Sequence, residues 1–88
     1  VEGFKWWVSA LDAGLRVFPN PVADDLSIRW EVAINRGITV ELFDMNGRLL
    51  QSRNIDGATK AATLNTSALP AGVYLLRIDG AVRRVVKR

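Results

Sequence analysis

The 88-residue sequence contains no cysteine and no histidine. The lack of cysteine excludes disulfide bonds, cysteine nucleophiles and thiolate metal ligands. The lack of histidine excludes Ser-His triads and imidazole metal sites. The remaining chemistry is limited to carboxylates, lysine, tyrosine and hydroxyls. We therefore expect a protein that is not an enzyme and that holds no cofactor and no metal.

No apolar stretch approaches the ~20 residues that a membrane-spanning helix requires, so we expect no transmembrane segment. A hydrophobic content of 49% with 24% charged residues is typical of a folded globular chain. The length suits one compact domain. The sequence begins at Val1 without a secretory leader, which indicates a fragment or a processed piece of a larger protein.

The net charge of +3 has a definite location. Four of the 12 basic residues, Arg83, Arg84, Lys87 and Arg88, lie within the last six positions. Without them the chain has 8 basic and 9 acidic residues, a net charge of −1. Because nucleic-acid-binding proteins usually spread basic residues over one face, we expect no nucleic-acid partner.

From residue 15 onward, short apolar runs alternate with turn residues, and no segment has a helical period. This pattern predicts an all-β Greek-key sandwich of about seven strands. The expected strands are 15–18, 25–31, 38–43, 48–52, 60–64, 73–78 and 82–87.

Two strands have informative side-chain patterns. In 25–31, Leu26, Ile28 and Trp30 share one face, which predicts a half-buried strand. Residues 73–78 are apolar on both faces except at Arg77, which predicts a central strand buried on both sides.

The breaks between strands carry turn signals. Pro19, Asn20 and Pro21 end the first run, because proline removes backbone donors. The segment 44–47 (DMNG) predicts a tight hairpin turn, since Asn-Gly tolerates positive φ. In 69–72 (LPAG), Gly72 is expected to supply a conformation that other residues do not tolerate. Tyr74 is expected in the core, with its hydroxyl at the rim.

Residues 1–14 differ from the rest of the chain. Phe4, Trp7, Val8 and Leu11 would share one face of a short helix. The segment could instead be an edge strand or the end of an upstream domain. We favour a linker or the tail of an upstream domain.

Two candidate acidic sites have weak support. Asp24 and Asp25 are adjacent, so on a strand they would point to opposite faces rather than pair. Asp44 and Asn46 begin like a calcium loop, but an arginine and a leucine occupy the next alternate positions. A hairpin turn is the favoured interpretation of the second segment.

Three islands of sequence together resemble one family. They are 17–21 (VFPNP) with 24–28 (DDLSI), 40–50 (VELFDMNGRLL), and 64–78 (LNTSALPAGVYLLRI) followed by 84–87 (RVVK). In this order, over residues 15–88, they resemble the type A C-terminal sorting domain of cargo proteins of the Bacteroidetes type IX secretion system.

The resemblance implies an Ig-like β-sandwich that acts as a non-catalytic address. Such a domain follows a cargo domain, enters the periplasm with it and is recognised by the outer-membrane translocon. A surface sortase usually cleaves upstream of it and joins the cargo to a lipopolysaccharide anchor. The implied partners are translocon and sortase components and the attached N-terminal cargo domain. The implied location is the periplasm in transit, then the cell surface or the medium.

The resemblance also assigns roles to residues. Structural roles are expected for Pro19, Asn20, Pro21, Asp44, Asn46, Gly47, Arg48, Leu69, Pro70, Gly72 and Tyr74. Translocon recognition is expected for Arg83, Arg84, Val85, Val86, Lys87 and Arg88.

Two of these assignments have alternatives. Residues 19–21 could be a recognition element rather than a strand break. In the tail, Arg83, Arg84 and Lys87 could form a solvated edge that discourages strand pairing. The translocon could instead read this strand through its free edge, its charges or both. Arginine stands at 83, 84 and 88, where lysine is commoner in the family, so a lysine-specific contact is in doubt there.

The alternative function is a carbohydrate- or surface-binding module of a secreted enzyme. It rests on Trp6 and Trp7, since Trp30 shares the apolar face of its strand. The sequence leaves open whether the domain is monomeric or self-associates through an edge strand, either the last strand or residues 1–14, because an open sandwich has unpaired edges.

Overall fold

A computed structural model describes residues 14–88. The expectations for the linker or tail, including those for Trp6 and Trp7, therefore lie outside the described residues except at Gly14. The described chain forms seven strands and one short 3₁₀ helix. They are β1 (Arg16–Phe18), β2 (Asp25–Arg29), β3 (Gly37–Asp44), β4 (Leu49–Asp56), η3 (Gly57–Thr59), β5 (Ala61–Asn65), β6 (Gly72–Ile78) and β7 (Ala81–Lys87).

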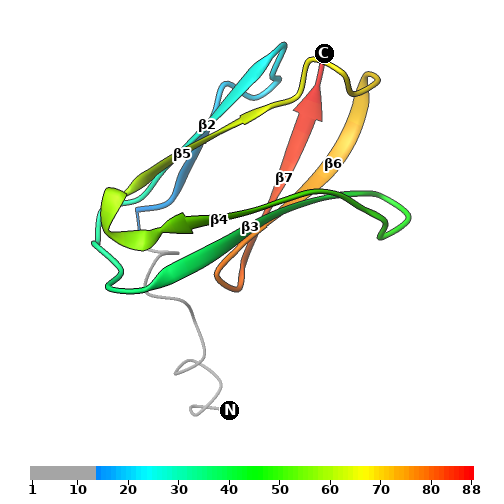
Figure 1. Ribbon diagram of the computed structural model, residues 1–88. Helices are drawn as coiled ribbons and strands as arrows, with labels where there is room; N and C mark the ends of the chain where they lie inside the picture. Colours follow the sequence, from blue (N-terminus) through cyan, green and yellow to red (C-terminus); the bar gives the residue numbers. More distant parts are fainter. Residues whose placement is uncertain (1–13) are drawn as a thin grey trace, which may run out of the picture.

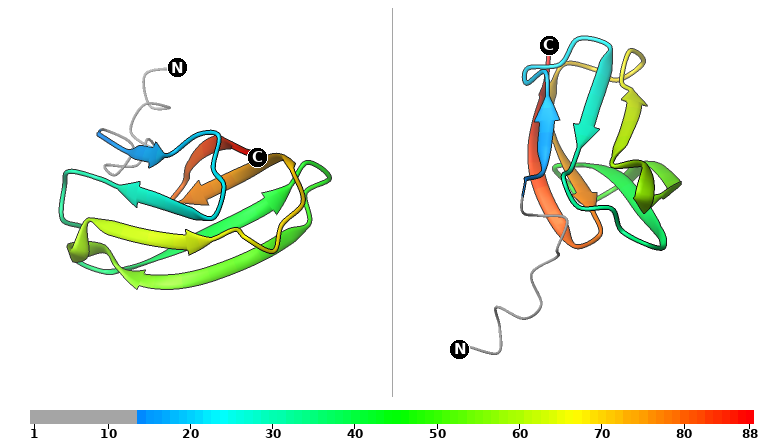
Figure 2. Two further views of the ribbon diagram at one scale, coloured as in Figure 1. Left: turned by 90° about the horizontal axis from the view of Figure 1, so that it is seen from above. Right: turned by 90° about the vertical axis from the view of Figure 1, so that its left-hand side faces the viewer.

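The strands form two sheets that face each other as the layers of a sandwich (Figures 1 and 2). One sheet has the order β1-β2-β5, the other β4-β3-β6-β7, and neighbouring strands within each sheet are antiparallel. The chain leaves β4 for the other sheet, where β5 pairs with β2, and then returns to place β6 beside β3. This crossing confirms the predicted all-β Greek-key sandwich.

The core lies between the sheets and is built by alternate residues of the strands. Along β3, the positions predicted to share one face, Ile38, Val40 and Leu42, are at most 2% exposed. The same holds for Leu26 and Ile28 of β2, which are fully buried. The same core cluster contains Leu64, Tyr74, Leu76, Ile78, Ala81 and Val85, joined by Val22 and Trp30.

Trp30 follows β2 and completes its buried face at 3% exposure. Its indole Nε1 donates to the carbonyl of Gly57 over 3.1 Å, and the Ile34 amide donates to the same carbonyl over 3.0 Å. A Cβ atom on Gly57 would lie 2.6 Å from Cβ of Ile34. The chain at η3 therefore requires a glycine, and Trp30 is a core residue rather than part of a sugar-binding platform.

The hairpin between β3 and β4 confirms the turn predicted at 44–47. The Gly47 amide donates to the Asp44 carbonyl over 3.0 Å, and the Asp44 carboxylate accepts from the amides of Asn46 and Arg48, each over 2.9 Å. Gly47 alone in this turn has positive φ, at +87°. Arg48 also pairs with Asp44 through its side chain at 3.4 Å. The carboxylate thus serves the turn, as the favoured interpretation predicts.

Strand β4 is longer than the sequence pattern indicated, because it continues past residue 52 to Asp56. Its inward positions Gln51 and Arg53 are polar, which interrupts the alternation. Gln51 donates to the Asn65 carbonyl over 2.9 Å and Arg53 to the Thr63 carbonyl over 2.8 Å. These polar side chains bridge the two sheets between the edge strands β4 and β5, where an apolar side chain would be exposed to solvent.

Strand β6 lies between β3 and β7, which confirms its predicted central position. The prediction that it is buried on both faces is wrong. Val73 is 38% exposed and Leu75 is half-buried, because these residues point away from the core. No described element packs on that outer face of the four-stranded sheet.

Candidate recognition site at the C-terminal strand

The terminal strand β7 divides its side chains between two faces. The inner face carries Ala81, Arg83, Val85 and Lys87, of which Ala81, Val85 and Lys87 are buried and Arg83 is half-buried. The outer face carries Val82, Arg84, Val86 and, just beyond the strand, Arg88. Arg84 and Arg88 are exposed, with the half-buried Val86 between them. The tail residues predicted as one recognition set therefore separate into a structural row and a presented row.

The interpretation of Lys87 as part of a solvated edge is wrong. Lys87 is only 9% exposed, and it follows Val85 on the inner face at the end of the sandwich. Its Nζ donates to the carbonyl of Arg88 over 3.1 Å. A long aliphatic stem allows lysine to be buried while its amine keeps a polar partner.

Asn20 binds the backbone of β7 through both ends of its amide. Its Nδ2 donates to the Arg84 carbonyl over 3.1 Å, and its Oδ1 accepts from the Val86 amide over 2.8 Å. The peptide bonds before both flanking residues, Pro19 and Pro21, are cis. The predicted strand break at 19–21 thus also contacts the outer edge of the terminal strand.

Val22 continues this contact with its backbone. Its amide donates to the Val86 carbonyl and its carbonyl accepts from the Arg88 amide, both over 2.8 Å. Val22 forms a parallel bridge with Lys87 and is fully buried. The chain leaving β1 in one sheet therefore pairs with β7 in the other. From Arg84 to Arg88, these bonds occupy the edge of the terminal strand that was expected to be free.

The third sequence island forms the corner that leads into β6. The Tyr74 hydroxyl donates to the Pro70 carbonyl over 2.5 Å, and Tyr74 is 7% exposed. The Leu69 amide donates to the Thr66 carbonyl over 2.9 Å. Gly72 has φ of +157°. A tyrosine at this place, bonded a few residues upstream, is the tyrosine corner of Ig-like sandwiches. The expected placement of Tyr74 is confirmed.

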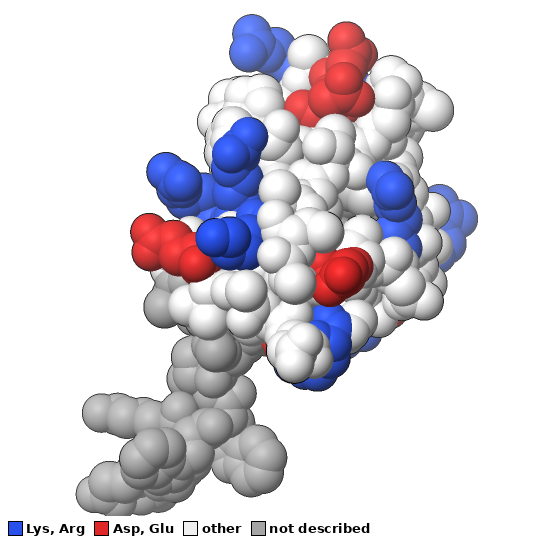
Figure 3. Space-filling model, turned by 60° about the vertical axis from the view of Figure 1, so that its left-hand side comes forward, with Lys and Arg blue, Asp and Glu red and all other residues white. Residues whose placement is uncertain are grey.

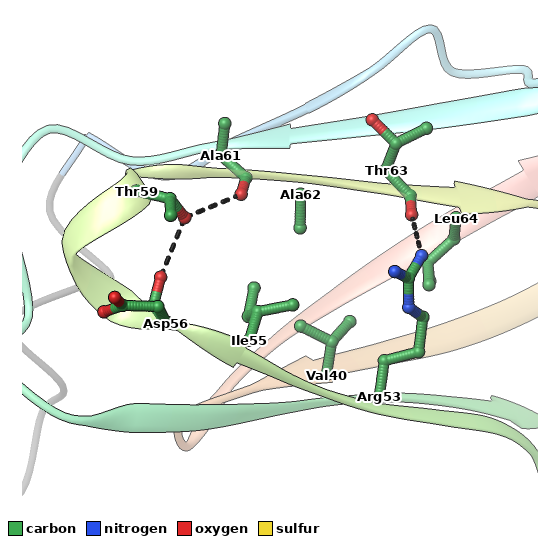
Figure 4. A pocket seen from close by; sticks show the side chains of 9 residues that line it. All are labelled: Val40, Arg53, Ile55, Asp56, Thr59, Ala61, Ala62, Thr63 and Leu64. Atoms are coloured by element: carbon green, nitrogen blue, oxygen red, sulfur yellow. Dashed lines mark hydrogen bonds between the residues drawn. The ribbon is translucent and has the colours of Figure 1, made fainter.

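A groove opens on the other side of the sandwich, between β4 and β5 (Figure 4). It has a volume of about 260 Å³, and its apolar lining is Val40, Ile55, Ala61, Ala62 and Leu64. At its rim the Thr59 hydroxyl contacts the carbonyls of Asp56 and Ala61 at 2.7 and 3.1 Å. These polar groups serve the backbone, and the groove holds no pair of carboxylates or nucleophile with a base.

A family model matches residues 16–88, described as the secretion system C-terminal sorting domain. The chain belongs to that family. The sorting domain is a non-catalytic signal of the type IX secretion system, and its cargo is a secreted or surface protein. Such a role implies an interaction with the secretion machinery.

Two solved structures resemble the sorting domain. A DUF3244-family protein with an immunoglobulin-like β-sandwich fold, from Bacteroides vulgatus, has a TM-score of 0.69 at 20% identity. The match covers 85% of each chain. Dimeric latent PorU from Porphyromonas gingivalis has a TM-score of 0.63 at 16% identity, over 83% of this chain and 9% of that chain. These likenesses show an Ig-like fold. No protein among the curated sequences matches the chain.

The face of the sorting domain in Figure 3 carries no continuous basic field. On the face in Figure 3, basic and acidic groups are interspersed over a largely uncharged surface. Among residues 14–88, no three acidic side chains are grouped so as to hold a metal ion, and no helix is long and apolar enough to cross a membrane.

Sequence reasoning missed Val22, which joins the two sheets at the terminal strand. A signal was present, since Val22 is an apolar residue directly after Pro21 and before the polar run that opens β2. Its partners, Val86 and Arg88, lie at the other end of the chain, so the pattern around Val22 could not identify them.

Proposed function

We propose that this sorting domain directs a cargo protein attached to its N-terminus through the type IX outer-membrane translocon. We further propose that the translocon contacts the presented row of the terminal strand, Arg84, Val86 and Arg88. Val85 and Lys87 would contribute by holding the strand in place, and Arg83, half-buried on the inner face, would lie at the margin of the contact.

The observation that supports this proposal is the way the strand is held. Asn20 and Val22 bond the backbone of β7 from Arg84 to Arg88. The two arginines therefore project from a fixed backbone at a separation of roughly 13 Å, the rise of four strand residues. A fixed array loses little conformational entropy on binding, and guanidinium groups form directed, paired bonds with carboxylates.

The route of the cargo belongs to the same proposal. The domain would accompany its cargo into the periplasm, and the outer-membrane translocon would bind it there. A surface sortase would then cleave upstream of the folded sandwich, within residues 1–14 or before them. The cargo would remain at the cell surface or pass into the medium.

Export of a reporter protein tests the proposal. The reporter is fused upstream of residues 1–88 and expressed, with a secretory leader, in a host that has the type IX machinery. The measured quantity is the reporter outside the cell relative to the reporter in the periplasm. In the double variant Arg84→Gln and Arg88→Gln we expect this ratio to fall at least about tenfold, since each charge-assisted hydrogen bond is worth roughly 1.5–3 kcal/mol.

The matched control is the double variant Arg16→Gln and Arg29→Gln. These arginines are exposed and face each other across β1 and β2 in the other sheet, so the control removes the same charge elsewhere. It should export as the parent does. Equal export by both double variants would contradict the proposed contact. Deletion of 83–88 is a poorer test, because it removes Val85 from the core.

A further inference from the structure

The outer face of the four-stranded sheet carries more apolar surface than a solvent-facing sheet usually does. We define the outer sheet face as Phe43, Leu49, Val73, Leu75, Val82 and Val86. Three of them are well exposed, with Leu49 at 47%, Val73 at 38% and Val82 at 50%. Antiparallel sheets normally place polar residues at such positions, so this face departs from the expected alternation.

Strand register places most residues of the outer sheet face side by side. Phe43 on β3 stands opposite Leu49 on β4 and Leu75 on β6. Val73 on β6 stands opposite Val86 on β7. Directly opposed residues have Cβ atoms about 4.5–5.5 Å apart, so the side chains within each of these groups adjoin. Val82 instead stands opposite Arg77.

The other sheet shows what a face without a partner looks like in this domain. The outward residues of β2 and β5 are Asp25, Ser27, Arg29, Ala61, Thr63 and Asn65, which are polar or small. Phe18 of β1, opposite Ser27, is the exception in this sheet and is 41% exposed. The apolar character is therefore concentrated on the four-stranded sheet. It also explains why the sequence of β6 indicated burial on both faces, although the described chain covers only one.

The charged residues on and beside the outer sheet face indicate what kind of partner it could bind. Arg84 stands opposite Leu75, and Arg88 follows β7. Two carboxylates stand at outward positions of these strands: Glu41 is paired with Arg77 at 2.6 Å, and Asp56, at the end of β4, accepts from the Ala58 amide over 3.0 Å. Arg77 in turn lies 5.1 Å from the centre of the Phe43 ring. Arg84 and Arg88 form no ion pair with another residue of 14–88, so the apolar residues of the face have a positive border at β7.

We propose that the outer sheet face is a docking surface for a protein of the secretion machinery whose own surface is apolar and bordered by carboxylates. This inference rests on the proposed function and extends the contact from the row on β7 across β6, β3 and β4. Four strands of about seven residues span roughly 19 by 23 Å. That is about half of one side of a standard protein–protein interface, so the arginine row and the sheet face together have the size of a transient contact.

The test uses the same reporter fused to the full chain, with the triple variant Leu49→Gln, Val73→Thr and Val82→Thr. Threonine keeps the β-branched shape that suits a strand. We expect the exported fraction to fall about tenfold, as loss of apolar groups at the centre of an interface does. Thermal unfolding of the purified variant should stay within about 5 °C of the parent, since exposed substitutions have small effects on stability.

The matched pair of single variants is Val82→Thr and Val32→Thr. Val32 is 47% exposed in the loop between β2 and β3, away from the outer sheet face. Val82→Thr should lower export and Val32→Thr should leave it unchanged. Equal loss in both single variants would overturn the docking surface.

Failure of this inference is separable from failure of the proposed function. Normal export of the triple variant, with loss in the arginine double variant, would overturn the docking surface and leave the arginine contact in place. The reverse pattern would support the docking surface and overturn the role of the arginines. A parent fusion retained in the periplasm would overturn both.

Two other binding partners of the outer sheet face, a second copy of the chain and a lipid surface, are tested with the purified chain. In sedimentation the parent should be a monomer, and a dimer that the triple variant dissociates would assign the outer sheet face to a second copy. The parent should not co-sediment with vesicles of phosphatidylethanolamine and phosphatidylglycerol. Binding that the triple variant abolishes would assign the face to a lipid surface and overturn the protein partner.

Discussion

Replacing Asn20 by alanine removes both side-chain bonds to the terminal strand while leaving the rest of the domain unchanged. The Arg84 carbonyl loses its donor and the Val86 amide loses its acceptor. The backbone contacts of Val22 with Val86 and Arg88 remain. The substitution therefore isolates what the asparagine contributes to holding β7 against the sandwich.

The expected loss follows from the two bonds. Each is worth about 0.5–1.5 kcal/mol net, and water can replace part of both, because Asn20 is exposed. We expect the free energy of unfolding to fall by roughly 1–2 kcal/mol. In a domain of 60–100 residues each kcal/mol lowers Tm by about 4–8 °C, so Tm should fall by roughly 5–15 °C.

Thermal unfolding followed by circular dichroism measures the global effect. Amide hydrogen exchange measures the local effect at β7. In the variant, the Val86 amide should exchange faster than in the parent, while the amides of β2 change less. Asn35→Ala, in an exposed loop, is the matched control and should leave Tm unchanged. An Asn20→Ala protein that melts within about 2 °C of the parent, with the Val86 amide still protected, would refute the reasoning.

Three further substitutions test other parts of the fold. Tyr74→Phe removes the bond to the Pro70 carbonyl and should lower the free energy of unfolding by about 1–1.5 kcal/mol in urea titration. Gly57→Ala places a methyl group 2.6 Å from Cβ of Ile34, and should cost about 1–3 kcal/mol, whereas Ala58→Gly beside it should cost under about 1 kcal/mol. Arg53→Ala frees the Thr63 carbonyl and should lower Tm by several degrees, about 4–8 °C; an unchanged Tm would show that this bond adds nothing to stability.

Local patterns predicted most of the strands because their causes are local. The alternation at Leu26, Ile28 and Trp30 requires only that one face of a strand be buried. The turn at 44–47 requires only a glycine that accepts positive φ and an aspartate within reach of two amides. These features were predicted within a few residues of their observed positions.

The predictions failed where a residue's environment comes from distant segments. β4 was predicted too short because its inward residues Gln51 and Arg53 are polar and interrupt the apolar alternation. In the structure their side chains donate to backbone carbonyls of β5. A solvated edge was one of two alternatives for Lys87, but the end of the sandwich encloses this residue. β6 was expected to be buried on both sides, but the second side lacks a covering layer in the described chain. A charged residue or an apolar run indicates a preference for solvent or for burial, but it does not identify the segment that will pack against it.

The sequence by itself determined the all-β architecture, the hairpin, the absence of cysteine and histidine chemistry, and the family. It determined them because they depend on periodicity, turn residues and composition within short stretches. Only the tertiary structure decided that Asn20 meets Arg84 and Val86, which are 64 and 66 residues away. It also decided which tail arginines are presented, because strand register assigns each side chain of β7 to the core or to the surface.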